Sequence, residues 1–331
     1  MDTSLVIPTH DRRRTLIRTL DALCRVDYPA GRWEVIVVDD GSNDGSSEAV
    51  RALAAAGALP VSCLSQPPRG PAAARNRGAR AARGAKLIFL DDDIRVEADF
   101  VSRHVAALDA NPGCWILGRV VQRPEMRQTP FGRYREILWE SFHAAHSATQ
   151  AAETEGMGAA NLSLPRADLE RLGGFDEEVR IASCEDMLLG IRAREAGIRV
   201  LYEPGIVGVH DDWAVTLERF CERQRLYSIS DVLLFRRLGG HSPRLTVICR
   251  NGPLRWREDG LSLSLTKLAK ALLASPPLRA ALTVAAKVVG RLAPDTRPSH
   301  ALYEAAIAVS IFRGVREGFR LHPARPSDPS P

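Results

Sequence analysis

Three consecutive aspartates, Asp91, Asp92 and Asp93, directly follow an apolar run in the stretch KLIFLDDDI, residues 86–94. Two unit charges about 4 Å apart repel by roughly 4 kcal/mol at an effective dielectric constant of about 20, so the cluster needs water or a cation to offset its charge. Alternate side chains of an extended segment share a face, and we therefore expect Asp91 and Asp93 to point one way and Asp92 the other. A solvated acidic turn is the alternative interpretation.

A second acidic pair, Glu185 and Asp186, lies in the stretch CEDMLLG at the start of a predicted helix. Acids in a first helical turn are favoured by the helix dipole. Taken alone, the pair therefore fits a structural role.

A repeated pattern of a short apolar run, a polar loop and an amphipathic helix must position the aspartates. The apolar runs are residues 4–8, 34–38, 59–65 and 86–90. Helices are expected over 13–24, between the second and third runs as far as Gly57, and over 72–84, with Asp11 as the N-cap of the first. Strands that alternate with helices at this spacing predict right-handed crossovers, a parallel sheet and the α/β fold class.

Ligands of such a sheet bind beyond the carboxyl ends of its strands. The polar residues at those ends are Thr9, Asp11, Asp39, Asp40, Arg69 and the three aspartates of the acidic cluster. The loop after the first run, PTHDRR, matches neither the G-x-G-x-x-G dinucleotide motif nor the GxxxxGKS/T phosphate loop. We therefore expect a metal ion, rather than a glycine-rich loop, to hold phosphates at this edge.

The later part of the chain changes character twice. Residues 122–157 have few strand signals and carry the aromatic residues Phe131, Tyr134, Trp139 and Phe142. They predict either a mobile loop-and-helix segment over an active site or a surface helix. From Leu217 onward the pattern is mainly helical, and the proline-rich tail HPARPSDPSP is expected to be disordered.

The composition indicates a globular chain. Of 331 residues, 45% are hydrophobic, and the net charge of +5 rests on dispersed arginines without a nucleic-acid motif, so no nucleic-acid partner is expected. Six cysteines far apart, without zinc spacing, are typical of reduced thiols. There is no signal-peptide pattern and no uninterrupted apolar window of about 18 residues, so we expect a cytoplasmic protein.

Seven stretches in order resemble an inverting family 2 glycosyltransferase with the GT-A fold: VIPTHDRRRTLIRTLDAL, EVIVVDDGSNDGS, RGPAAARNRGA, LIFLDDDI, GAANLSLPRADLERLGGFDEE, CEDMLLGIRAREAG and VLYEPGIVGVH. The resemblance implies a mostly parallel sheet flanked by helices, a UDP-, GDP- or dTDP-linked sugar donor and a Mn²⁺ or Mg²⁺ cofactor. The sugar would move, with inversion, to a hydroxyl of a glycan, glycolipid or natural product.

By motif position, the resemblance also assigns the donor site. The nucleoside pocket would include Pro8, Thr9 and Asp39. The further donor-binding residues would be Asp11, Asp40, Asp91 and Asp92, with Asp91 placed to meet the ribose or a metal-bound water, although Asp40 is equally suited to cap the next helix. Arg69 and Arg75 would reach the diphosphate or ribose, or lie solvated at helix ends.

The same resemblance supplies metal, base and acceptor residues. Asp93 would ligate the metal with Asp91 as the other acid of a D-x-D motif. His210 would complete the metal site, touch the diphosphate or simply be packed. Asp186 would be the base that deprotonates the acceptor, with Glu185 holding the acceptor or tuning Asp186. Asn161, in GMGAANLS, would line the sugar and acceptor pocket.

We expect a GT-A catalytic domain over residues 1–216, a helical extension over 217–320 and a tail over 321–331. Residues 301–321, ALYEAAIAVSIFRGVREGFRL, are apolar and then basic. They predict either a helix on the inner face of an anionic membrane, suited to a lipid-linked acceptor, or a helix packed on the catalytic domain.

Two rival functions predict different sequences. A nucleotidyltransferase-like enzyme would carry a basic, glycine-rich N-terminal signature. A catalytically inactive nucleotide-sugar-binding protein would have lost Asp93 or Asp186, and both residues are present.

Overall fold

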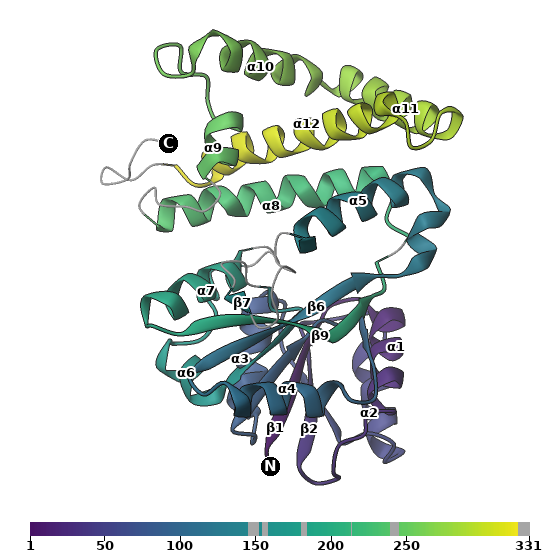
Figure 1. The fold of residues 1–331 in the computed structure, drawn as a ribbon, viewed down its shortest axis with the longest axis vertical. Helices are drawn as coiled ribbons and strands as arrows, with labels where there is room; N and C mark the ends of the chain where they lie inside the picture. Colours follow the sequence, from purple (N-terminus) through teal and green to yellow (C-terminus); the bar gives the residue numbers. More distant parts are fainter. Residues whose placement is uncertain (145–151, 154–157, 180–183, 213, 239–244, 324–331) are drawn as a thin grey trace. The chain divides into compact units, whose positions relative to one another are not determined.

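The computed structural model describes residues 1–144, 152–153, 158–179, 184–212, 214–238 and 245–323. It divides the chain into two compact units, Met1–Pro124 with Trp139–Trp213, and Glu125–Leu138 with Ala214–Pro331 (Figure 1). The predicted domain boundary at residue 216 does not account for Glu125–Leu138, because this earlier segment belongs to the second unit. In the expected tail, Leu321 is still helical, and residues 324–331 lie outside the described residues.

Nine strands of the described chain form one mixed sheet in the first unit, in the order β3-β2-β1-β4-β8-β6-β9-β5 with β7 paired to β9. The strands are β1 Thr3–Thr9, β2 Trp33–Asp39, β3 Val61–Ser65, β4 Lys86–Leu90, β5 Ile94–Val96, β6 Cys114–Gln122, β7 Ala152–Glu153, β8 Asn161–Pro165 and β9 Arg199–His210. The four predicted runs form β1 to β4, which pair in parallel, whereas β8 is antiparallel to β4 and β6. The predicted α/β class is confirmed.

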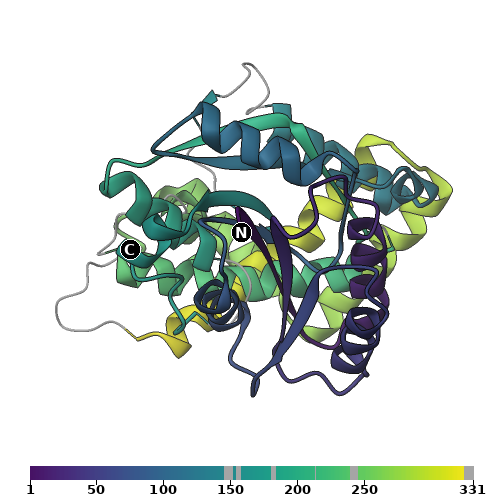
Figure 2. The same cartoon turned by 90° about the horizontal axis from the view of Figure 1, so that it is seen from below.

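Helices cover both faces of this sheet because its strands turn alternate apolar side chains to opposite sides. The helices are α1 Arg13–Leu23, α2 Ser46–Ala55, α3 Pro71–Ala81, α4 Phe100–Ala110, α6 Arg166–Arg171 and α7 Glu185–Glu195. Leu5 and Val35 pack in one core with α1, α2 and α4, while Val6 and Ile36 pack in the other with α3, α6 and α7. Figure 2 shows α1 and α2 on one side of the strands and α3 on the other.

The second unit is helical. After the short 3₁₀ helix η1 Pro124–Gln128, its helices are α5 Pro130–Ala144, whose first part belongs here, α8 Leu217–Arg237, α9 Leu245–Asn251, α10 Gly260–Leu273, α11 Pro276–Leu292 and α12 Arg297–Leu321. Phe131 and Tyr134 of α5 are buried in its core beside Tyr303. The remainder of segment 122–157 includes residues 145–151 and 154–157, which lie outside the described residues.

The apolar side of residues 301–321 is buried inside this unit. Tyr303, Val309, Phe312 and Val315 are buried, and α12 packs along α8 and against α11. This packing leaves the apolar side of α12 unavailable to a membrane surface.

Candidate active site

The three aspartates do not alternate as expected. After β4 they form a turn instead of an extended segment, so the alternation rule does not apply. Asp92 Oδ1 and Asp93 Oδ2 both accept from Nη1 of Arg12, at 3.1 and 2.5 Å. Asp91 turns away and pairs with Nη2 of Arg75 at 2.8 Å. The expectation that Asp92 points away from Asp93 is wrong, because both carboxylates meet the same nitrogen of Arg12.

The guanidinium of Arg12 is the cation that offsets the acidic cluster in this structure. Although burial opposes the shift, the carboxylates of Asp92 and Asp93 raise the pKa of Arg12 above its usual value. Burial raises the pKa of Asp92 to about 7 against the opposing effect of Arg12, and the charge of Asp93 adds to the rise. Asp92 also accepts from the hydroxyl of Thr9 at 2.6 Å, so Thr9 and Asp92 hold each other.

His210 lies beside Asp93 because β5 and β9 pair antiparallel, with Ile94 opposite His210. Its Nε2 is 3.4 Å from Asp93 Oδ1, and its Nδ1 is 3.4 Å from the side-chain nitrogen of Gln122. The Trp139 ring stacks on the imidazole with centroids 6.3 Å apart. The contacts from Gln122 and Trp139 orient His210 toward Asp93.

The pair Asp93 and His210 fits a small divalent cation. Mg²⁺ and similar ions are commonly held by one or two protein ligands together with water and substrate phosphates. Within the described part of the chain, no group of three or more His, Cys, Asp or Glu side chains gathers as a metal site. Asp91, engaged by Arg75, does not join this pair, so the remaining ligands would come from a bound diphosphate and water.

Arg75 links the end of β4 to the start of α7. Its Nη2 contacts Asp91 and its Nη1 contacts Glu185 Oε1, each at 2.8 Å, while its carbon Cζ lies 5.6 Å from the centre of the Phe175 ring. The side chains of Arg75 and Glu185 are only 5% and 3% exposed. Arg75 therefore ties two carboxylates together from a buried position. The alternative of a solvated arginine at a helix end is wrong for Arg75, and its reach toward a diphosphate or ribose stays a prediction.

Of the two acids in the first turn of α7, Asp186 remains partly exposed, whereas Glu185 is buried. Its Oδ2 accepts from the backbone N–H of Ala159 at 3.1 Å, and its Oδ1 accepts from the N–H of Met187 at 2.7 Å. Burial, together with the neighbouring charge of Glu185, raises the pKa of Asp186 to about 7. Such a group changes its charge near neutral pH.

Acidic side chains link the loop after β1 to the loop after β2 through hydrogen bonds. Asp11 has φ 49° and accepts from the N–H of Asn43, while Asp44 accepts from the N–H of Arg13 at the start of α1. The N-terminal N–H of α1 is therefore satisfied by Asp44, and the expectation that Asp11 caps this helix is wrong.

Asp39 lies at the end of β2 and is buried. Although burial opposes the effect, hydrogen bonds from Ser42 and Ser47 lower the pKa of Asp39 below its usual value. The β1 register places Pro8 opposite Val38 and Thr9 opposite Asp39. The structure thus brings Pro8, Thr9 and Asp39 to one edge, as expected for a nucleoside pocket, without testing that role.

Asp40 fixes the loop that leads into α3, and the alternative that it caps the helix after β2 is wrong, because no side chain caps α2, whose N-cap is Gly45. Its carboxylate accepts from the N–H groups of Arg69 and Gly70, at 2.8 and 2.7 Å, and from the side chain of Gln66. Gly70 is the N-cap of α3, and these bonds therefore hold the two residues that precede its first helical turn. The Arg69 guanidinium is exposed and pairs with Glu177 at 2.8 Å.

Asn161 is buried within the sheet instead of lining a pocket. Its Oδ1 lies 2.8 Å from Nε2 of His104, and its Nδ2 donates to the carbonyls of Arg119 and Ile206 at 3.1 Å each. A Cβ at Gly118 would overlap the Asn161 amide, so this glycine makes room for it. The expectation that Asn161 faces the sugar is wrong, because these contacts use its amide to join β8 to β6 and β9.

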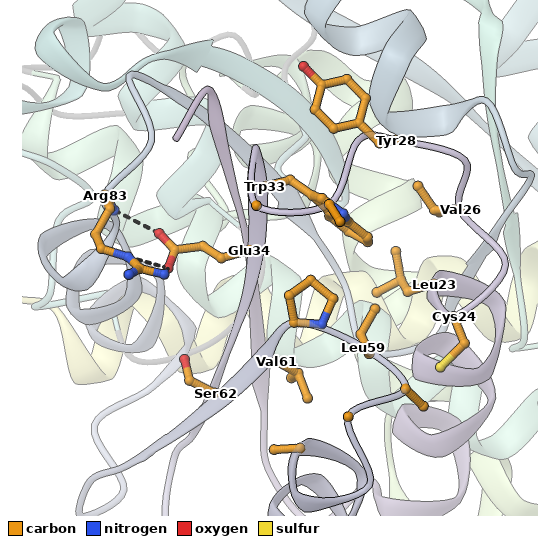
Figure 3. Close-up of a pocket in the computed structure, with 16 residues that line it drawn as sticks. Leu23, Cys24, Val26, Tyr28, Trp33, Glu34, Leu59, Val61, Ser62 and Arg83 are labelled. Carbon is orange, nitrogen blue, oxygen red and sulfur yellow. Dashed lines mark hydrogen bonds and ion pairs between the residues drawn. The ribbon is translucent and has the colours of Figure 1, made fainter.

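Of two cavities in the first unit, one borders the acidic cluster and the other does not. One of about 320 Å³ borders the acidic cluster and is lined in part by Arg12, Asp93 and Asp211. Another, of about 640 Å³, lies where β2 and β3 begin, between Trp33, Leu59 and the ion pair of Glu34 with Arg83 (Figure 3). The second cavity therefore lies at the opposite end of the strands from the acidic cluster of Asp91, Asp92 and Asp93.

The family model for glycosyl transferase family 2 matches residues 4–173, slightly more than half of the chain. The chain belongs to this family. The match begins in β1 and includes the Asp91–Asp93 turn, so the acidic cluster lies within the family region.

Curated relatives of this family 2 chain are glycosyltransferases by name. Glycosyltransferase AglE of Haloferax volcanii is 27% identical over 207 residues, 62% of this chain and 66% of the relative. Validoxylamine A glucosyltransferase of Streptomyces hygroscopicus is 32% identical over 221 residues, 59% of this chain and 52% of the relative. The chain thus spans less than two thirds of the length of these relatives.

Solved structures confirm the GT-A-like fold of this family 2 chain. The mannosyltransferase PcManGT from Pyrobaculum calidifontis, in complex with GDP-Man and Mn²⁺, has a TM-score of 0.62 at 22% identity and covers 94% of this chain and 86% of its own. Residues 1–349 of Staphylococcus aureus TarS give a TM-score of 0.51 at 20% identity, covering 97% of this chain and 92% of that structure. At sequence identities this low, the similarity shows the fold alone.

Two features of the candidate active site were not predicted from the sequence. One is Arg12, whose only signal is its place in the loop directly after β1. The other is the set of arginines around the buried carboxylate of Asp211, namely Arg18 at 3.2 Å, Arg95 at 3.3 Å and Arg123 at 2.8 Å. The sequence suggests Asp211 only as a neighbour of His210 that raises its basicity or faces solvent. Its arginines come from α1, β5 and the end of β6, so only the folded sheet reveals the cluster.

Proposed function

We propose that this protein transfers one sugar, with inversion, from a UDP-, GDP- or dTDP-linked donor to an acceptor hydroxyl, with Mn²⁺ or Mg²⁺ bound at Asp93 and His210. Family membership supports sugar transfer from a nucleotide sugar. The glucosyltransferase among the relatives and the GDP-Man and Mn²⁺ of the mannosyltransferase structure support the donor and the metal. Family membership also disfavours the nucleotidyltransferase alternative.

The observation that carries the proposal is the environment of Asp186. Glu185 lies beside it in the sequence and is tied through Arg75 to Asp91, so the base candidate and the acidic turn belong to one connected site. A carboxylate with a pKa of about 7 is matched to accepting a proton near neutral pH.

In this mechanism Asp186 accepts the proton of the acceptor hydroxyl while that oxygen attacks the anomeric carbon. The N–H groups of Ala159 and Met187 fix the carboxylate before the reaction. Burial raises the pKa of Asp186, and the negative charge of Glu185, which Arg75 holds in place, adds to the rise.

On the donor side, Asp93 and His210 would hold the cation, and Arg12 would supply positive charge beside the diphosphate. When bound, the divalent ion supplies Lewis-acid stabilisation of the leaving diphosphate. Pro8, Thr9 and Asp39 at the ends of β1 and β2 are the proposed nucleoside contacts.

The test compares Asp186→Asn with the wild type. Hydrolysis of the nucleotide sugar, with water as acceptor, is followed as release of nucleoside diphosphate, and donor binding is measured by calorimetry. We expect Asp186→Asn to bind the donor normally and to lose turnover by about 100-fold or more, since general-base catalysis typically contributes a factor of about 10² to 10⁴.

Glu195→Gln, an exposed acid on the same helix, is the matched control and should retain activity. Turnover by Asp186→Asn at the wild-type rate would refute the base assignment. Donor binding without turnover in the wild type, also with candidate acceptors, would favour the inactive binding protein instead.

A further inference from the structure

The helices α10 and α11 expose an apolar surface that the rest of the second unit does not cover. On α10 the exposed residues are Leu261 at 77%, Leu265 at 57%, Leu268 at 44% and Leu272 at 65%. Their spacing of four, three and four residues places them on one side of the helix. We name these four residues the leucine stripe.

α11 carries exposed apolar residues of its own after a short break. Val284, Val288 and Leu292 are 58%, 47% and 81% exposed and lie four residues apart. Trp256, just before α10, is 69% exposed. Isolated exposed apolar residues are ordinary, whereas a set repeated along two consecutive helices indicates an interaction surface.

The charges of this segment all have one sign. Residues 260–292 contain no Asp or Glu and five basic residues, Lys267, Lys270, Arg279, Lys287 and Arg291. Lys267 is buried in an ion pair with Asp259, and Lys287 pairs with Glu218 at 2.6 Å. Arg291 is exposed on α11, and Arg257 is exposed beside Trp256, next to Glu258, which pairs with Arg255. Arg257 and Arg291 therefore supply exposed positive charge near the apolar residues.

These charges help to decide whether the apolar surface binds a second copy of this chain or a lipid bilayer. A second copy of this chain meeting the same surface would place basic residues against basic residues, with no acid in the segment to pair with them. A bilayer surface with anionic headgroups accepts leucine and valine side chains at its acyl boundary and attracts lysine and arginine at its headgroups. Exposed tryptophan is also typical of that boundary.

The geometry favours lying on a bilayer over crossing it. No single helix of the described chain is long and apolar enough to span a membrane, and only α10 and α11 taken together reach that length and composition. The chain bends by 91° between them. Two short amphipathic helices at such an angle can both lie in the plane of the interface.

We propose that α10 and α11 dock this protein on the surface of an anionic lipid bilayer, with the leucine stripe in the acyl boundary. The proposal does not depend on the sugar-transfer chemistry, although a docked enzyme would suit a lipid-linked acceptor. It assigns to α10 and α11 the membrane contact that the sequence suggests for residues 301–321.

Sedimentation with vesicles tests this proposal. The full chain is mixed with phosphatidylcholine vesicles that either contain or lack phosphatidylglycerol. We expect binding to the anionic vesicles, at least about tenfold weaker binding to the neutral ones, and loss of binding at high salt, where charge attraction is screened.

Variants then separate the apolar and charged parts. The double variant Leu265→Gln with Leu272→Gln should weaken binding to anionic vesicles about tenfold or more, because both side chains lose their apolar contact with lipid. Arg257→Gln with Arg291→Gln should weaken binding to anionic vesicles only. Leu321→Gln, which changes an apolar residue 59% exposed outside this surface, is the matched control and should bind normally.

Helical circular dichroism and light scattering of each variant check its fold and its oligomeric state. Absence of wild-type binding to anionic vesicles would overturn the proposal, as would equal loss in the Leu321→Gln control. A wild-type dimer that the leucine double variant converts to a monomer, without vesicle binding, would assign the surface to self-association and also overturn it.

Discussion

Neighbouring acids of α7 have different surroundings and therefore different chemistry. Glu185 is buried in an ion pair with Arg75, whereas Asp186 is partly exposed and held only by backbone N–H groups in the contacts described above. Sequence position alone makes the two residues equivalent members of a first helical turn. The fold distinguishes them, because it brings Arg75 of α3 to one and leaves the other open.

The raised pKa of Asp186 predicts a pH dependence of the reaction. Only the ionised carboxylate can accept a proton, so turnover should rise about tenfold per pH unit below a pH of about 7 and level off above it. The measurement is nucleoside diphosphate release from saturating donor between about pH 5 and about pH 9. Donor binding over the same range serves as the control, and turnover that is flat between about pH 5 and about pH 7 would contradict the assignment.

At the scale of elements, the sequence predicts the strands better than the side chains at their ends. The runs 4–8, 34–38 and 86–90 lie within β1, β2 and β4, because apolar runs between polar loops identify buried strands. The directions of Asp91 to Asp93 could not be predicted. They depend on a turn and on arginines from α3 and the β1–α1 loop.

Asn161 shows the same limit. Its neighbours in sequence are small and polar residues of a loop, which suggested a pocket. Its actual partners, His104 on α4 and the carbonyls of Arg119 and Ile206, are all distant in sequence. The long-range pairing of β8 with β6 decides its role, and no local pattern reports that pairing.

The link between β4 and α7 predicts a stability effect at Arg75. Arg75→Met removes the cation between Asp91 and Glu185 and leaves the buried Glu185 carboxylate uncompensated. We expect the free energy of unfolding, measured with urea, to fall by about 3–5 kcal/mol. Arg80→Met on the same helix, where the guanidinium is exposed, should change it by at most about 1 kcal/mol. Similar values for both variants would contradict the structural role of Arg75.

At the scale of the whole molecule, the chain combines a sheet-based unit with a helical unit that has its own core. Within the helical unit, Gly314 of α12 faces α8, and an added Cβ would overlap the carbonyl oxygen of Arg225. Helices approach this closely only where a side chain is missing. The second unit therefore depends on this contact for its packing.

We expect Gly314→Ala to lower the free energy of unfolding by about 1–3 kcal/mol, the usual cost of overpacking. Thermal unfolding followed by circular dichroism measures the change, and nucleotide binding should be retained because the candidate donor residues belong to the first unit. Ala301→Ser, at an exposed position of the same helix, is the control. Unchanged unfolding of Gly314→Ala would show that α8 and α12 do not pack this closely.

The central claim is a metal-dependent nucleotide-sugar site at the carboxyl ends of the strands, and calorimetry tests it most directly. UDP, GDP and dTDP are each titrated, with and without Mn²⁺, into the wild type, Asp93→Asn and the control Asp21→Asn, which changes an exposed acid on α1. We expect one nucleotide to bind only with the metal, Asp93→Asn to lose that binding by about tenfold or more, and Asp21→Asn to retain it. If no nucleotide bound under any metal condition, or if Asp93→Asn bound as well as the wild type, the site would be contradicted.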